Sequence, residues 1–129
     1  MRFSYNPFTK RVFKLRTPAV IPISNLDLTP LTFDAKVKRQ DMTGIAAQNL
    51  YNLYGVCLHL GGDSAANGHY IAYCMAADGK WYKFDDEHVT AVRRMDQELE
   101  SRRFQENCYV LFYRKRHEQA TKTGTTATQ

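Results

Sequence analysis

The sequence predicts a mainly β (α+β) fold, an antiparallel sheet meander with little helix. Residues 1–5 alternate in character with a period of two, which places Met1, Phe3 and Tyr5 on one side and is typical of a half-buried strand. Further along, β-prone apolar runs alternate with short polar turns. These runs cover residues 51–60, 70–75, 80–84 and 109–113.

The first third of the chain predicts a hairpin followed by an extended segment. Residues 6–10 contain Asn-Pro turn chemistry and should form the hairpin tip, with residues 12–15 as the returning strand. Prolines at 18, 22 and 30 make a central strand or a helix unfavourable within residues 19–31. Residues 32–48 are mixed and polar, and we expect an irregular connection there.

The middle and end of the chain give the sharper signals. Residues 51–60 carry large apolar side chains on both faces and predict a strand buried on both sides. Residues 61–68 predict a mobile loop, 76–79 a turn and 89–92 a short strand. Residues 96–103 predict a short helix with Met95 and Leu99 facing inward, and Trp81 and Phe84 are interpreted as core residues.

Length and composition predict a single domain over residues 1–116 and a disordered polar tail over 117–129. No run approaches the roughly 18 apolar residues that cross a bilayer, and the first residues lack the apolar region of a secretory signal. We therefore expect a cytoplasmic and/or nuclear protein with no membrane partner. The net charge of +5 is spread over short basic clusters, which indicates solvated surface; a nucleic-acid partner is the less favoured alternative.

The three cysteines, Cys57, Cys74 and Cys108, are odd in number and widely spaced. This pattern predicts no disulfide framework and no zinc site, and nothing else in the sequence predicts a cofactor or a metal. Each cysteine lies in an apolar run, so each is interpreted as a small buried hydrophobe.

One pair of side chains suggests chemistry. His69 stands where a loop enters a predicted strand, and Asp85 stands where the next strand ends, 16 residues later. Two antiparallel strands joined by a short turn bring such positions within about 5–8 Å, close enough for a side-chain hydrogen bond. An imidazole oriented by a carboxylate is two-thirds of a nucleophilic triad. The pattern alone more often marks a surface histidine and an acidic turn.

Four segments together resemble a known family. They are Tyr-Asn-Leu-Tyr-Gly-Val-Cys-Leu-His-Leu-Gly at 51–61, Gly-His-Tyr at 68–70, Trp-Tyr-Lys-Phe-Asp-Asp at 81–86 and Tyr-Val-Leu-Phe-Tyr at 109–113. In order and spacing they resemble the C-terminal His-box region of the ubiquitin-specific proteases, papain-like cysteine deubiquitinases. Residues 2–28 resemble the preceding strands more loosely. The resemblance implies the palm part of a domain that is built like a hand.

The resemblance also implies roles for individual residues. His69 matches the general base, Asp85 the carboxylate that orients it, and Asp86 an auxiliary polar position. Gly68 would let the backbone approach a substrate, and Tyr70 would help to wall the channel for the ubiquitin tail. The implied reaction is hydrolysis after the ubiquitin C-terminal Gly, with His69 Nε2 facing the nucleophilic thiol.

The family's nucleophile segment, which resembles Gly-Asn-Thr-Cys, is absent from this chain, as are its CxxC zinc pairs. Cys74 lies five residues beyond His69 on one strand, about 17 Å away, and Cys57 matches an ordinary core position. Neither is expected to act as nucleophile. Because residue 1 falls inside an expected longer strand, we favour a fragment over a degenerate paralogue, and we expect the isolated chain to be marginally stable.

The sequence therefore predicts the C-terminal part of a ubiquitin carboxyl-terminal hydrolase that supplies His and Asp of a Cys-His-Asp triad and is inactive alone. The expected partners are ubiquitin or ubiquitin-conjugated proteins and the Cys-bearing N-terminal half of the same domain. The alternative is a non-catalytic ubiquitin-binding module.

Overall fold

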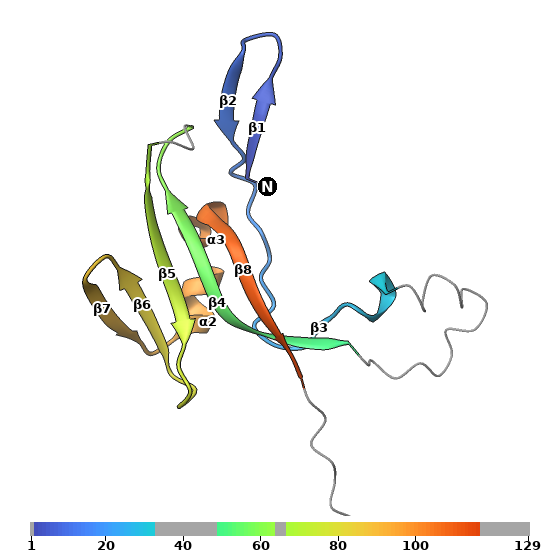
Figure 1. The fold of residues 1–129 in the computed structure, drawn as a ribbon, viewed down its shortest axis with the longest axis vertical. Helices are drawn as coiled ribbons and strands as arrows, with labels where there is room; N and C mark the ends of the chain where they lie inside the picture. Colours follow the sequence, from blue (N-terminus) through green and yellow to red (C-terminus); the bar gives the residue numbers. More distant parts are fainter. Residues whose placement is uncertain (1, 33–48, 64–66, 117–129) are drawn as a thin grey trace, which may run out of the picture.

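The computed structural model describes residues 2–32, 49–63 and 67–116. A two-stranded hairpin stands beside a six-stranded antiparallel sheet, and two short helices cover one face of that sheet (Figure 1). The predicted mainly β meander is thus confirmed. The expectations for the connection at 33–48, the loop centre at 64–66 and the tail at 117–129 lie outside the described residues.

The hairpin consists of β1 (Phe3–Asn6) and β2 (Arg11–Lys14), as predicted. Its turn is held by the side chain of Asn6, whose Oδ1 accepts hydrogen bonds from the backbone N–H groups of Phe8 at 2.9 Å and Thr9 at 3.1 Å. An Asn side chain that bonds the backbone two residues ahead closes a turn in this way.

The proline-rich segment is extended, as expected, except for two short elements. These are β3 (Leu26–Asp27), which pairs with the start of β4, and a 3-10 turn η1 (Thr29–Leu31) that carries Pro30 near its start. Pro is tolerated there because the first helical N–H groups have no intrahelical acceptor. Ile21 of this segment reaches the core.

The large sheet is built around β4 (Leu50–Leu60), which pairs with β3, with β5 (His69–Met75) and with β8 (Cys108–Lys115). The meander continues from β5 to β6 (Trp81–Asp85) and then to β7 (His88–Val92). β4 is buried on both sides, as predicted, because Val56 and Leu58 face the helices while His59 is covered on the opposite face.

The predicted single helix is in fact two, α2 (Met95–Glu100) and α3 (Arg102–Asn107). The break falls at Ser101, whose backbone is extended and whose hydroxyl oxygen accepts the N–H of Phe104 at 3.2 Å. Ser is a favoured helix N-cap because its side chain satisfies such a free N–H. Met95 and Leu99 are buried as predicted. Within the described residues, the helices are too short to cross a membrane.

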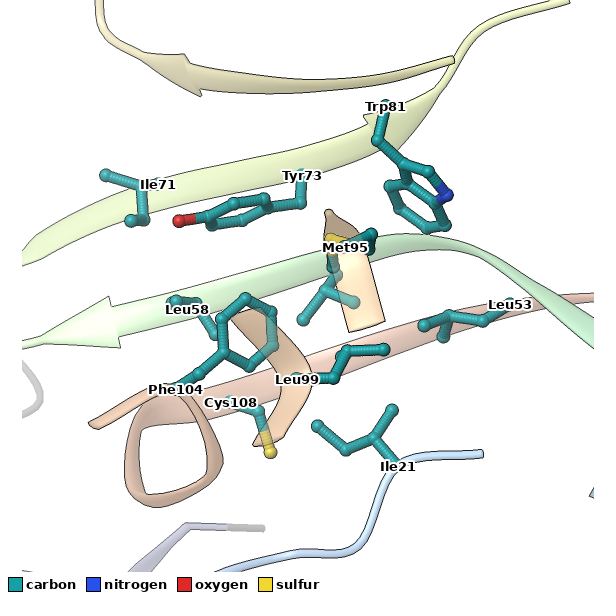
Figure 2. Close-up of a cluster of buried hydrophobic side chains, with 11 residues drawn as sticks. Ile21, Leu53, Leu58, Ile71, Tyr73, Trp81, Met95, Leu99, Phe104 and Cys108 are labelled. Carbon is teal, nitrogen blue, oxygen red and sulfur yellow. The ribbon is translucent and has the colours of Figure 1, made fainter. Parts of the chain in front are cut away.

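One face of the sheet forms the core. Figure 2 shows Ile71 and Tyr73 of the sheet in one cluster with Phe104 of α3 and with Leu99 and Met95 of α2. The ring centroids of Tyr73 and Phe104 are 5.0 Å apart. Trp81 joins this cluster as predicted. Phe84 does not: it is 40% exposed, because its even-numbered position in β6 points to the face without helices. Cys74 is exposed for the same reason, so its interpretation as a buried hydrophobe is wrong.

The hairpin is tied to the sheet by a buried lysine. Lys14 is only 5% exposed, and its ammonium donates to the backbone carbonyl of His59 and, at 2.6 Å, to Oδ1 of Asn107. Burial lowers the pKa of Lys14, with a further contribution from nearby Arg side chains. The ammonium thus joins β2, β4 and the end of α3.

We expect Leu99→Ala to destabilise the chain by about 2–5 kcal/mol, because it leaves a cavity between α2 and the sheet. Leu31→Ala is the matched control. Leu31 is 69% exposed against 6% for Leu99, so its truncation should change stability by less than about 0.5 kcal/mol. Urea unfolding followed by circular dichroism measures both, and equal effects would contradict the assigned core.

Candidate catalytic site

The site lies where β5 begins and the antiparallel strand β6 ends, and their pairing places two side chains on one face. Tyr73 pairs with Lys83, and Met75 pairs with Trp81. Side chains alternate between faces along a strand, so the odd-numbered residues of both strands share the helix-covered face. His69 at the start of β5 and Asp85 at the end of β6 both belong to this set.

The two side chains meet. His69 Nε2 lies 2.5 Å from Asp85 Oδ1, with side chains 43% and 33% exposed. The predicted contact between His69 and Asp85 is confirmed. The expected ring orientation is wrong, however, because Asp85 holds Nε2 and leaves Nδ1 as the ring nitrogen for a second partner. With its proton on Nε2, a neutral imidazole presents Nδ1 as an acceptor.

Besides His69, Asp85 has a cationic neighbour that was not predicted from the sequence. Lys83 Nζ lies 2.8 Å from Asp85 Oδ2, so the two carboxylate oxygens serve two different partners. The signal was present in the sequence, because residues two apart on a strand lie on the same face.

The charges and hydrogen bonds at the site shift the pKa of both His69 and Asp85. The hydrogen bond that Asp85 accepts from His69 raises the pKa of His69 above its usual 6.5. The charge of Asp86 adds to that effect, while burial and, to a smaller extent, the charge of Lys83 oppose it. Hydrogen bonds from Lys83 and then from His69 lower the pKa of Asp85 to about 2. The His69 shift stabilises the fold below the usual pKa and is lost as pH rises through the raised value. The Asp85 shift acts above pH 3.8 and is lost toward pH 2.

Asp86 occupies the turn between β6 and β7 with a positive φ of 50°. This left-handed conformation is one that Asp tolerates better than most residues. The turn places the Asp86 charge near His69, where it favours the imidazolium. Its catalytic role as an auxiliary residue stays a prediction.

Gly68 is required by packing inside the chain. A Cβ on Gly68 would lie 2.3 Å from Nε2 of His59 and 2.9 Å from the carbonyl oxygen of Leu60. The close approach that a glycine allows here is to the buried His59 ring. Contact of Gly68 with a ubiquitin tail stays a prediction. Because Gly68 immediately precedes His69, this packing fixes the point at which the chain enters β5.

Tyr70 lies on the face opposite His69, since its partner in β4 is His59 while that of His69 is Leu60. The Tyr70 ring centroid is 4.9 Å from that of His59 and 5.9 Å from that of Tyr109. It is 46% exposed, so one side of the ring is open to a partner. Its contact with a ubiquitin tail stays a prediction.

None of the three cysteines is placed to react with His69. Cys57 and Cys74 lie on the opposite face, as their pairing with Ala72 and Gly55 shows. Cys108 is buried in the core, where burial raises the pKa of its thiol. Within residues 2–32, 49–63 and 67–116, no three His, Cys, Asp or Glu side chains gather to hold a metal ion.

Comparisons with known proteins match most of this chain. A family model described as ubiquitin carboxyl-terminal hydrolase matches residues 1–113. The chain is 37% identical to ubiquitin carboxyl-terminal hydrolase 10 of Arabidopsis thaliana over 129 residues, 98% of this chain and 12% of that relative. It is 46% identical to ubiquitin carboxyl-terminal hydrolase 43 of Mus musculus over 69 residues, 53% of this chain and 5% of that relative.

The fold matches solved structures as well. A SAGA DUB module bound to monoubiquitin contains a chain that is 26% identical, with a TM-score of 0.61 over 90% of this chain and 22% of that chain. A yeast SAGA DUB module gives a TM-score of 0.62 at 24% identity, over 91% of this chain and 22% of that chain. The chain thus spans about a fifth of these solved chains and 12% or less of the two relatives named above.

We expect Asp85→Asn to lower the pKa of His69, because it removes the hydrogen-bonded anion that is the main cause of the raised value. Asp86→Asn is the matched control and should lower the pKa of His69 less, since Asp86 acts through its charge alone. Imidazole NMR signals followed against pH measure both. A larger effect at Asp86 would show that the orienting carboxylate is assigned one position too early.

Proposed function

The chain belongs to the ubiquitin carboxyl-terminal hydrolase family, and we propose that it supplies the general base, His69, and the orienting carboxylate, Asp85, to a cysteine-dependent deubiquitinase. The observation that carries the proposal is the 2.5 Å contact between His69 Nε2 and Asp85 Oδ1. An imidazole held by a carboxylate through one nitrogen has the other nitrogen free to exchange a proton with a nucleophile.

The reaction is acyl transfer from ubiquitin to a thiol and then to water. The thiol gives its proton to Nδ1 of His69, and the thiolate attacks the carbonyl carbon of the isopeptide bond. The C–N bond breaks as the His69 imidazolium protonates the leaving lysine amine. Water, deprotonated by the same imidazole, then hydrolyses the thioester and releases the ubiquitin carboxylate. Asp85 stabilises the imidazolium in each half of the cycle.

The thiol has to come from outside this chain, so we propose that the chain alone is inactive and acts with a Cys-bearing part of the same kind of domain. The positions of Cys57, Cys74 and Cys108 support this. So does the apolar surface on the sheet face without helices, where large side chains are 37–58% exposed. That surface comprises Tyr70, Phe84, Val89, Tyr109, Val110 and Phe112.

A second candidate is a ubiquitin-binding module without catalysis. The absence of a thiol beside His69 within this chain favours it, and the solved neighbour whose title describes a complex with monoubiquitin offers a precedent for binding. The half-exposed Tyr70 ring is the side chain that we expect to carry the binding.

A chimera tests the catalytic proposal. Residues 1–116 replace the matching segment of the Arabidopsis relative, and hydrolysis of a ubiquitin C-terminal fluorogenic substrate is measured. His69→Ala should lower kcat by at least about 100-fold, because no base remains to activate the thiol. Asp85→Asn should lower it less, since the imidazole stays but is less well oriented. An active chimera that tolerates His69→Ala would refute the assignment.

The isolated chain separates the two candidates. A ubiquitin probe with an electrophilic C-terminus should leave the wild-type chain unlabelled, since none of its thiols faces His69. When unmodified ubiquitin is titrated into the isolated chain, it should bind measurably only under the second candidate. Tyr70→Ala should then weaken binding about 10-fold or more. Phe8→Ala, on a residue 95% exposed in the hairpin tip, is the control. Labelling of any cysteine would overturn the claim that the chain is inactive alone.

A further inference from the structure

We propose that Lys83 is a positioning residue: by binding the second oxygen of the Asp85 carboxylate, it sets how firmly the His69–Asp85 pair holds its proton. The inference rests on the proposed function in so far as the pair is catalytic. It concerns a residue to which neither the resemblance nor the comparisons gave a role.

The geometry gives each oxygen of Asp85 its own partner. Oδ1 lies 2.5 Å from His69 Nε2, and Oδ2 lies 2.8 Å from Lys83 Nζ. With one oxygen held by the ammonium, the plane of the carboxylate is fixed by contacts at both ends. Lys83 and Asp85 are both 33% exposed, so this ion pair is screened less than the outer pair between Lys80 and Asp78, whose side chains are 71% and 49% exposed.

The backbone makes the arrangement rigid. Lys83 sits in the middle of β6, paired with Tyr73 on one side and Thr90 on the other. Asp85 is two residues further along the same strand and on the same face. Lys83 cannot move without disturbing two ladders, and Asp85 is held by its pairing with His88 of β7. Such a scaffold keeps functional groups in place.

Around the pair, the positive charge of Lys83 opposes the negative charges of two carboxylates. Asp85 and Asp86 both favour the imidazolium form of His69, and Lys83 is the cation that opposes them. Other titratable groups are close: Tyr73, Glu98 and Arg103 line a cavity with Lys83 and Asp85, and His88 of β7 pairs with Asp85 in register.

The chemistry of the proposed cycle explains why this opposing charge matters. The base has to accept a proton from the thiol and later return it to the leaving amine. A carboxylate without a second cation would hold the imidazolium, and with it that proton, more firmly. Lys83 reduces this hold and, through the same contact, keeps Asp85 ionised.

The isolated chain provides the first test, which does not depend on catalysis. In Lys83→Met the pKa of both His69 and Asp85 should rise, because the opposing cation and the second hydrogen bond to the carboxylate are gone. Lys83→Arg keeps charge and donors and should behave as the wild type. Lys80→Met is the matched control on the same hairpin, and it should change neither group. NMR titration of the imidazole and carboxyl signals reports all three. An unchanged or lowered His69 pKa in Lys83→Met would overturn the inference.

The chimera provides the second test. Lys83→Met should move the pH profile of kcat/KM along the pH axis, with KM changed by less than about twofold, while Lys83→Arg restores the wild-type profile. A uniform loss of kcat/KM at every pH, without a shift of the profile along the pH axis, would show that Lys83 has only a structural role and would overturn the inference. If the NMR shifts occur but the wild-type chimera is inactive, the proposed function fails while the coupling of Lys83 to the pair stands.

Discussion

The register between β5 and β6 is the constraint on which the site depends. Pairing of Ala72 with Phe84 and of Tyr73 with Lys83 puts the odd-numbered residues of both strands on the helix-covered face. A slip of one residue would carry Asp85 to the opposite face and leave His69 without its carboxylate. That register is specified by burial, because Tyr73 and Trp81 have to reach the core on the same side. The packing that stabilises the fold therefore also aligns the proposed catalytic pair.

A second constraint acts on the chain just before His69. His59 is fully buried, and neither of its ring nitrogens has a hydrogen-bond partner among the residues that the structure describes. Burial lowers the pKa of its imidazole. Its ring fills the space that a Cβ on Gly68 would need, while its backbone carbonyl accepts the Lys14 ammonium. One residue of β4 thereby connects the hairpin to the entry of β5. The hairpin is far from His69 in sequence, yet it helps to fix the position at which the chain enters β5 at His69.

The sequence predicted the strands and the meeting of His69 with Asp85, because alternation and turn chemistry are local signals. It misplaced Phe84 and Cys74, since an apolar run does not reveal which of its two faces receives the helices. It merged α2 and α3 because the capping role of Ser101 depends on a backbone bend that periodicity does not report. The choice of Nε2 over Nδ1 was also out of reach, because a ring orientation follows from the approach of the strands.

The two faces of the sheet divide the chemistry. The face with α2 and α3 is closed over an apolar core and carries His69, Lys83 and Asp85 at one end. The other face carries Cys57 and Cys74 among half-exposed aromatic rings. Cys57 and Cys74 cannot meet Nδ1 of His69, because the sheet itself separates them from it. Under the proposed function, the nucleophile therefore approaches the start of β5 from a separate element, with the imidazole already aligned by Asp85 of β6.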